Sequence, residues 1–282
     1  MFERIAIAIA FSPRLQTLLA EANRIQQLFD SELIIIHVGS HTQEDNMKME
    51  SSLKDADLLE KVKVIWESGD PAKRILSVCK KEKVDLLVAG ALKKEDFINY
   101  YLGSIARKIL RKADCSVLML TEPSLKSNPS KRMVIHAEDS PYATEAIKVG
   151  TYIGKVQSTS QLHIVREIKL YGLAMSASSE RTEDELSEIR RNLVNEEIQI
   201  VQDILKELDT IGLKINIKVI SGKSGFELSN FCNRTKSDLL IVGAPNRKMG
   251  IFDRVFPHDL EYIFADLPCD ILIVNPKRKN NG

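Results

Sequence analysis

Two glycines frame the segment whose residue types best suit phosphate binding. An apolar run, Val84 to Ala89, ends at Gly90; a polar segment with two lysines follows, and Gly103-Ser104 opens a stretch with helical spacing. A strand, a glycine loop and a helix that begins at glycine-serine can present backbone N–H groups to a phosphate, because glycine allows close approach and a helix N-terminus favours an anion. The same order also makes an ordinary turn, so the rest of the chain has to separate the two interpretations.

Other residues with reactive side chains do not form a recognisable set. Gly222-Lys223-Ser224 is part of a P-loop pattern, but that pattern needs a glycine where Ile217 stands inside a predicted strand. The five histidines share no spacing typical of metal ligands. No Ser-His-Asp set, Cys-His set or carboxylate pair can be assembled. We therefore predict no catalytic residues and no metal site.

The composition is that of an ordinary globular protein. With 282 residues, 44% of them hydrophobic and 28% charged, the chain can form two domains with sizeable cores. Its net charge of +1 gives no general attraction to nucleic acids or anionic membranes, and no apolar run reaches the roughly 20 residues that cross a bilayer. Four cysteines without a C-x-x-C spacing, and an N-terminus without a signal pattern, favour a reducing compartment. We expect the cytoplasm.

The chain contains two copies of one sequence pattern. The segment ESGDPAKRILSVCKKEKVDLLVAGA, which begins at Glu67, aligns without a gap with ISGKSGFELSNFCNRTKSDLLIVGA, which begins at Ile220. Upstream, Ser12-Pro13 matches Ser140-Pro141, and downstream ADCSVLML matches LPCDILIV. The segment between the copies is rich in Pro, Ser and Asn, as linkers are. We predict a first domain at residues 1–121, a linker at 122–130 and a second domain at 131–276.

Each copy alternates strands and helices. Short apolar or alternating runs predict strands, several of them buried on both faces; in the first copy they lie at residues 5–10, 33–38, 61–66, 84–89 and 117–120. Ser12, followed by Pro13, is expected to cap the first helix, and Asp70-Pro71 a later one. This alternation predicts the α/β class, with one doubly wound, parallel, five-stranded sheet in each copy.

These elements resemble a known family. The order strand, Ser-Pro, helix, together with SGDPAKRIL, VDLLVAGA and GSIARKILRKADCSVLML, resembles a universal stress protein domain. The second copy resembles the same family, so the chain looks like a tandem, two-domain universal stress protein. The resemblance covers nearly all of the chain except the linker and the last residues. It implies a Rossmann-like fold, a role in the stress response and, in some members, an adenine nucleotide as ligand.

The family's nucleotide-binding members carry the pattern Gly-x2-Gly-x9-Gly-Ser/Thr after the fourth strand. The resemblance implies ATP or AMP in the first domain, at Ala10, Val38, Gly90, Lys93, Gly103, Ser104 and Ile105. Two of these residues depart from the family. Lys93 replaces a glycine, so the loop must differ locally, although its ammonium would attract phosphate. Ala10 stands where the family has an acidic residue that contacts the nucleoside.

The second copy keeps the acid, as Glu138, and the first glycine, as Gly243, but not the rest of the loop. Asn246 replaces the next glycine. Phe256-Pro257 fall at the glycine-serine position, where proline removes an amide donor. We therefore expect any nucleotide in the first domain only.

Three functions remain open. The leading hypothesis is a non-catalytic, cytoplasmic stress-response protein that binds an adenine nucleotide in its first domain and acts through a protein partner. The second is an interaction scaffold in which neither site binds a nucleotide. The third, a nucleotide hydrolase, is disfavoured because acids for magnesium and a general base are missing and a fold alone is weak warrant for activity.

The last strand of each copy is short and apolar, at Val117–Leu120 and Ile271–Val274. Domains of the family often pair through these strands. Pairing them within one chain would remove two exposed edges that are aggregation hazards. We expect the two sheets to meet edge to edge as an internal pseudo-dimer, with Leu118 and Leu272 buried at the contact. A homodimer of the whole chain is also open.

Overall fold

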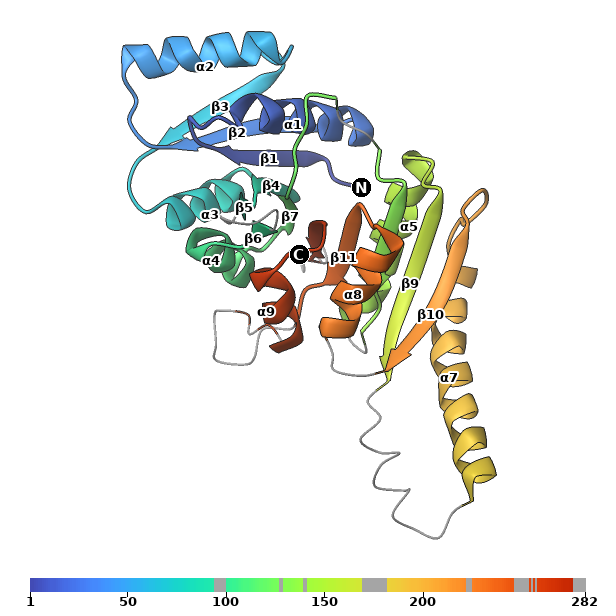
Figure 1. Ribbon diagram of the computed structural model, residues 1–282. Coiled ribbons are helices and arrows are strands. Elements are labelled where there is room, and N and C mark those ends of the chain that lie inside the picture. The colour runs from blue at the N-terminus through green and yellow to red at the C-terminus, as the bar shows by residue number, and fades with distance from the viewer. Residues whose placement is uncertain are drawn as a thin grey trace, which may run out of the picture.

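The computed structural model describes residues 1–93, 100–126, 129–138, 141–168, 182–221, 225–245, 254, 256 and 258–275 (Figure 1). The chain forms two α/β domains of matching topology, and the predicted fold class is confirmed. None of the described helices is long and apolar enough to cross a membrane.

The first domain alternates strands and helices from its start. It begins with β1 (Arg4–Ile9), α1 (Leu15–Phe29), β2 (Glu32–Val38), α2 (Gln43–Asp55), β3 (Val62–Glu67) and α3 (Pro71–Lys81). It continues with β4 (Leu86–Gly90), a hairpin of β5 (Leu92–Lys93) and β6 (Tyr100–Tyr101), α4 (Ser104–Lys112) and β7 (Ser116–Leu120). The parallel strands have the order β7-β4-β1-β2-β3, so the carboxyl ends of β4, β1 and β2 lie side by side.

The second domain repeats this plan. Its elements are β8 (Arg132–His136), α5 (Pro141–Val156), β9 (Gln161–Ile168), α7 (Glu183–Lys206), β10 (Ile215–Ser221), α8 (Phe226–Thr235), β11 (Leu239–Gly243), α9 (His258–Ala265) and β12 (Asp270–Val274). Its strands have the order β10-β9-β8-β11-β12, and all of their pairings with one another are parallel.

Local signals set two helix starts differently. Asp70 caps α3 as predicted, because its carboxylate accepts the Lys73 N–H at 2.8 Å. The prediction that Ser12 caps α1 is wrong, since the helix begins at Leu15 with Arg14 as its first flanking residue. Ser12 instead forms a turn before the helix: its carbonyl accepts the Leu15 N–H, and its hydroxyl accepts the Arg14 N–H.

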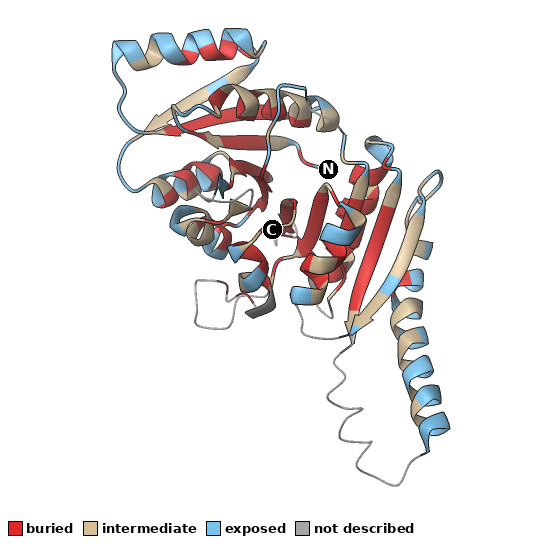
Figure 2. Cartoon of the chain, in the orientation of Figure 1, coloured by how far each residue is buried: buried red, intermediate tan, exposed pale blue. Residues whose placement is uncertain are grey.

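Apolar cores cover both faces of the sheet. The central strands are buried throughout, while the first half of α7 projects beyond the sheet and is mostly exposed (Figure 2). On one face α1 packs its apolar stripe against β1 and β2; on the other α3 and α4 pack against the same strands and β7. Burial on both faces explains the uninterrupted apolar runs of the central strands.

The two sheets join through their last strands. β7 and β12 pair antiparallel, with Leu118 opposite Leu272, and both side chains are buried. The expected edge-to-edge pairing is therefore present. It fuses the two five-stranded sheets into one ten-stranded sheet that is parallel except at this seam. The pairing removes both exposed edges, which is the physical reason for expecting it.

Backbone contacts extend the seam beyond the strands. From the first domain, Tyr100 forms a bridge with Leu267, and the Leu102 N–H donates to the Phe264 carbonyl at 2.9 Å. From the second domain, the Arg254 N–H donates to the Arg111 carbonyl at 2.8 Å, and its guanidinium donates to the Ala113 carbonyl. Each domain thus holds the other with residues that precede its last helix.

Candidate functional site

The residues implied by the nucleotide pattern lie at the carboxyl edge of the first domain's sheet. Ligands of open α/β sheets bind at this edge, beyond the ends of the strands. Strand order brings the ends of β1, β2 and β4 together, and α4 begins at the same edge. The predicted residues found there are Ala10 after β1, Val38 in β2, Gly90 in β4, Lys93 in β5, and Gly103, Ser104 and Ile105 at the start of α4.

The start of α4 can receive an anion. Gly103 precedes the helix with an extended backbone, φ −69°, and no side chain caps the helix. Ser104 and Ile105 are exposed, and the first turn contains no acidic residue. The N–H groups of this turn therefore lack an intrahelical partner, and the helix dipole adds a partial positive charge.

A side chain at Gly103 would displace the Leu92 side chain, whereas a side chain at Gly90 would meet only ordinary contacts. A Cβ at Gly103 would lie 2.6 Å from the Leu92 Cδ1, and a Cβ at Gly90 would lie 3.4 Å from the Leu18 Cδ2. Neither glycine is among those with a positive φ. Lys93 pairs with Tyr100 in the hairpin of β5 and β6.

Arg14 is the residue at this edge that sequence reasoning missed. Its guanidinium crosses the ends of β4 and β7, where Nη1 donates to the Ala91 carbonyl and Nη2 to the Thr121 carbonyl at 2.7 Å. Nη1 lies 3.8 Å from the Cβ position of Gly90. None of the described carboxylates forms an ion pair with Arg14. A basic residue directly after Ser12-Pro13, at the turn from β1 into α1, is the signal that could have found it.

The described carboxylates of the same edge are already engaged. Glu67, at the end of β3, lies 3.7 Å from the Arg74 guanidinium. Asp70 accepts from Lys108 at 2.9 Å, and this contact holds the pKa of its carboxyl below the usual value. These two carboxylates are therefore partly neutralised by neighbouring cations, which reduces their repulsion of a phosphate.

An aromatic cluster lies beside these groups, at the ends of β1, β2 and β3. Its members are Phe11, His37, His41 and Trp66: the rings of Phe11 and His37 are 4.7 Å apart, and those of His41 and Trp66 are stacked at 4.5 Å. Burial lowers the pKa of His37, so its ring is neutral at pH 7. Where the family has an acidic side chain near Ala10, this chain presents apolar rings.

Comparisons with known proteins agree with this fold. A family model described as the universal stress protein family matches residues 1–121, which are less than half of the chain. A universal stress protein of Methanocaldococcus jannaschii is 36% identical over 55 residues, which are 20% of this chain and 32% of that relative. The match therefore spans about a third of that relative's length.

Two crystal structures resemble the whole chain. A universal stress protein of Archaeoglobus fulgidus superposes with a TM-score of 0.66 and 14% identity, over 96% of this chain and 97% of that one. A Pseudomonas aeruginosa protein of unknown function superposes with a TM-score of 0.69 and 14% identity, over 98% and 93% of the two chains. The whole chain therefore has a tandem universal stress protein fold.

The second universal stress protein-like domain fills the matching edge with its own side chains. Arg166 is buried and pairs with Glu197, and its Nη1 donates to the Ala137 carbonyl at 2.8 Å. His136 is buried there, 3.8 Å from Glu167, and Glu138 is half-buried. Asn246 and Pro257 lie outside the described residues. No three described His, Cys, Asp or Glu side chains in either domain come together as a metal site.

The alignment of the two phosphate-loop positions needs a correction by one residue. The helices begin at Ser104 and His258, and Tyr100 and Arg254 play equivalent parts in the seam. The extra residue of the second copy therefore precedes α9, so that Gly103 matches Pro257 and not Phe256. Phe256 is buried against Phe264, with ring centroids 5.0 Å apart, as Leu102 is buried in the first domain.

Proposed function

We propose that this chain is a tandem universal stress protein, a non-catalytic, cytoplasmic stress-response protein whose first domain binds an adenine nucleotide, ATP or AMP. One observation carries the proposal: the uncapped start of α4 lies at the same strand ends as the Arg14 guanidinium. Exposed Lys93 adds an ammonium from β5. The phosphates would take the N–H groups of Ser104 and Ile105, with Lys93 and Arg14 balancing their charge.

The nucleoside would lie along the ends of β1 and β2, beside Ala10 and Val38. The partly exposed Phe11 ring and the exposed His41 ring offer apolar faces on which a purine can stack. Without a carboxylate at Ala10, a ribose hydroxyl loses a strong acceptor. We therefore expect binding to be driven by the phosphates and the base, and to be weaker than in family members that keep the acid.

Nucleotide occupancy, and not turnover, is the proposed signal. Glu67 and Asp70 at this edge are engaged by Arg74, Lys108 and the Lys73 N–H, so neither is placed as a general base or a magnesium ligand. The second domain fills its edge with Arg166, so we expect one site per chain. A protein partner would read the shape of the occupied edge.

The scaffold hypothesis is supported by a specific feature of the same site. The Leu92 side chain covers Gly103, and Arg14 already donates to two carbonyls. If these contacts persist in solution, the chain would bind protein partners without a nucleotide.

Titration of the full chain separates the two hypotheses. ATP or AMP at a hundredfold excess over its Kd should stabilise the protein by about 2.7 kcal/mol, which is visible as a thermal shift. Gly103→Val and Arg14→Met should each abolish the shift, because they narrow the approach to α4 or remove the guanidinium. Arg190→Met, on the exposed face of α7, is the matched control and should retain it.

Stoichiometry and turnover complete this test. Calorimetry should give one site per chain. Two equivalent sites, or no binding at millimolar nucleotide, would contradict the proposal. Phosphate release above that of the Gly103→Val variant would instead favour the hydrolase.

A further inference from the structure

Each domain contains one pair of buried cysteines at matching places. Cys79 on α3 is a neighbour of Cys115, which directly precedes β7, and the two thiols interact. Cys269, which directly precedes β12, interacts with Cys232 on α8 in the same way. All four are free thiols. Neighbouring free thiols are the starting point for an intramolecular S–S bond.

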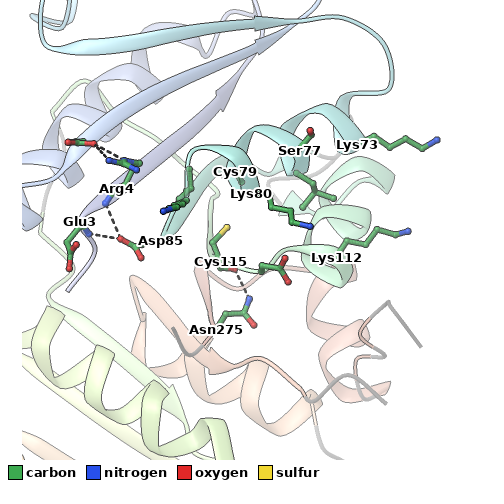
Figure 3. A pocket seen from close by; sticks show the side chains of 15 residues that line it. Glu3, Arg4, Lys73, Ser77, Cys79, Lys80, Asp85, Lys112, Cys115 and Asn275 are labelled. Carbon is green, nitrogen blue, oxygen red and sulfur yellow. Dashed lines mark hydrogen bonds and ion pairs between the residues drawn. The ribbon is translucent and has the colours of Figure 1, made fainter. Parts of the chain in front are cut away.

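The two pairs differ in their access to solvent. Cys79 and Cys115 both line a cleft of about 820 Å³ at the amino edge of the first domain (Figure 3). In the second domain the corresponding cleft is about 460 Å³, and of the pair only Cys269 lines it. A small oxidant that enters the first cleft can therefore reach both sulfur atoms.

The two clefts differ in charge: the first has a mixed lining, and the charged side chains described on the second are acidic. Basic side chains on the first cleft are Arg4, Lys73, Lys80, Lys83 and Lys112, accompanied by the acids Glu3, Glu32, Asp85 and Asp114. Of these acids, Glu32 pairs with Arg4, and Asp85 accepts the N–H groups of Glu3 and Arg4. The second cleft has only acidic charges: Glu122, Asp238, Asp266 and Asp270.

The neighbours of the buried thiols shift the pKa values of Cys79 and Cys269. The pKa of Cys79 is raised by its hydrogen bond with Cys115 and by burial. The pKa of Cys269 is raised by Cys232 and by burial, and the carboxylates of Asp270 and Asp238 raise it further. Because Cys79 keeps its proton, Cys115 is the sulfur that attacks in the first pair. Its thiolate is the reactive species, as in other cysteine oxidations.

We propose that Cys79 and Cys115 are a peroxide-sensitive pair that closes to a disulfide within the first domain. The Cys115 thiolate attacks one oxygen of hydrogen peroxide; the O–O bond breaks, and hydroxide leaves and takes up a proton to become water. The Cys79 sulfur then attacks the resulting sulfenic acid, the S–O bond breaks, and a second water leaves as the S–S bond forms. Two thiols are oxidised, and one peroxide is reduced to two waters.

The pair is also tied to the seam between the domains. The Asn275 side chain, directly after β12, donates to the Cys115 carbonyl at 2.6 Å, and its N–H donates to the Ser116 hydroxyl at 3.0 Å. A disulfide that moves Cys115 would therefore displace a contact made by the other domain. Oxidation of this pair would therefore change how the two domains contact each other.

Peptide mapping of the oxidised full chain tests the proposal. The protein is treated with hydrogen peroxide at pH 8, quenched with N-ethylmaleimide and digested without a reductant. Mass spectrometry should find a crosslinked peptide pair that contains Cys79 and Cys115 and is lighter by two hydrogens than its reduced parts. It should form faster than the Cys232–Cys269 crosslink, because both cysteines of the first pair line a cleft and only Cys269 of the second pair does.

Single variants assign the roles of the two sulfurs. Cys79→Ser should leave a Cys115 sulfenic acid that dimedone traps, whereas Cys115→Ser should leave Cys79 unoxidised. Cys232→Ser is the matched control and should not change the rate at which the first pair closes. Equal or faster closure of the second pair, crosslinks between chains, or sulfinic acid at Cys115 without a crosslink would each overturn the proposal, and the wild-type digest alone can show any of them.

Discussion

At the carboxyl edge of the first domain, the helix start at α4 is uncapped and the Arg14 guanidinium lies at the strand ends, whereas the second domain fills its edge with the buried Arg166 and reaches across the seam with Arg254. Arg14 donates to carbonyls of its own domain, whereas Arg254 donates to the Ala113 carbonyl across the seam. Phe256 is buried against Phe264. A duplicated domain can thus keep one edge open for a ligand and use the other for assembly, because each copy needs only one of these roles.

The amino edges differ in a parallel way. The first cleft has basic and acidic side chains around two thiols, and the second has acidic side chains around one. Matching residues after the last strands close them: Asn275 reaches Ser116, and Thr121 reaches Asp270. The shared fold sets where these contacts occur, and the side chains set their charge.

The largest expected effect tests whether the seam holds both halves together. Leu118→Lys would place an ammonium opposite Leu272, inside a contact that is buried on both sides. We expect the free energy of unfolding to fall by about 4 kcal/mol, because a buried unpaired charge replaces an apolar contact. Denaturant titration measures this change, and light scattering should show self-association through the freed edges. Leu125→Lys, at a position 68% exposed, is the control and should change neither.

A second variant tests the unequal use of the two segments that precede the last helices. Arg254→Ala removes a buried guanidinium and should cost about 3 kcal/mol, because the Ala113 carbonyl loses its donor. Tyr100→Ala, at the equivalent place, keeps its backbone bridge to Leu267 and should cost about 1 kcal/mol or less. Equal losses of unfolding free energy in urea titrations would contradict the view that the Arg254 side chain stabilises the seam more than the Tyr100 side chain does.

Much of this arrangement could be predicted from the residues alone. The apolar runs gave the strands, and the need to cover two apolar edges gave the pairing of Leu118 with Leu272. The predicted site residues also lie together at one edge. Local chemistry was sufficient to predict the Asp70 cap of α3, in which the carboxylate accepts from the nearby Lys73 N–H.

The features that were missed depend on contacts between distant residues. Arg14 acts through a long side chain that reaches Thr121, and no local pattern specifies that reach. The Ser12 cap failed because the turn through Pro13 delays the helix to Leu15. The position of the extra residue in the second copy became clear only from the partners of Tyr100 and Arg254.

The third effect is smaller and depends on pH. Of the two contacts Asn275–Ser116 and Thr121–Asp270, only the second contains a side chain that titrates, Asp270. Burial raises the pKa of Asp270 to about 6, against the hydrogen bonds from Thr121; nearby Glu21 raises it and Arg24 lowers it. In the unfolded chain the value is about 3.9. A carboxyl with a raised folded pKa favours the fold most below about pH 4, and this contribution is lost as the pH rises through about 6.

Asp270→Asn should therefore stabilise the protein at pH 8 by about 2 kcal/mol and have no effect at pH 4. The amide oxygen still accepts from the Thr121 N–H and hydroxyl, so the contact itself survives. Ser116→Ala, at the matching place in the first domain, is the control and should give a change that does not depend on pH. A constant difference for Asp270→Asn from pH 4 to pH 8 would contradict the raised pKa. The same variant should also speed closure of the Cys232–Cys269 pair.

The smallest effect concerns two positions that face each other across the pseudo-twofold axis. With Ser104 matched to His258, Arg107 of α4 matches Glu261 of α9, and these two residues form an ion pair that Arg111 joins at 2.8 Å. In a homodimer of either domain the same side chain would meet itself, as arginine on arginine or glutamate on glutamate. Duplication in one chain allows opposite charges at equivalent places. Both side chains are about a quarter exposed, so we expect a coupling energy of only about 1 kcal/mol.

A charge exchange isolates that coupling. Arg107→Glu and Glu261→Arg should each destabilise the chain, because each creates like charges across the axis, and the double variant should recover most of the loss. Arg111 makes the two single variants unequal. It would repel an arginine at position 261, both in the Glu261→Arg variant and in the double variant. Of the two single variants, Glu261→Arg should therefore be the less stable. Added salt should shrink all of these differences, because the pair is partly exposed. If the losses of unfolding free energy simply added in the double variant, the ion pair would contribute nothing, and the two domains would be joined by the β7–β12 pairing and the Arg254 contact.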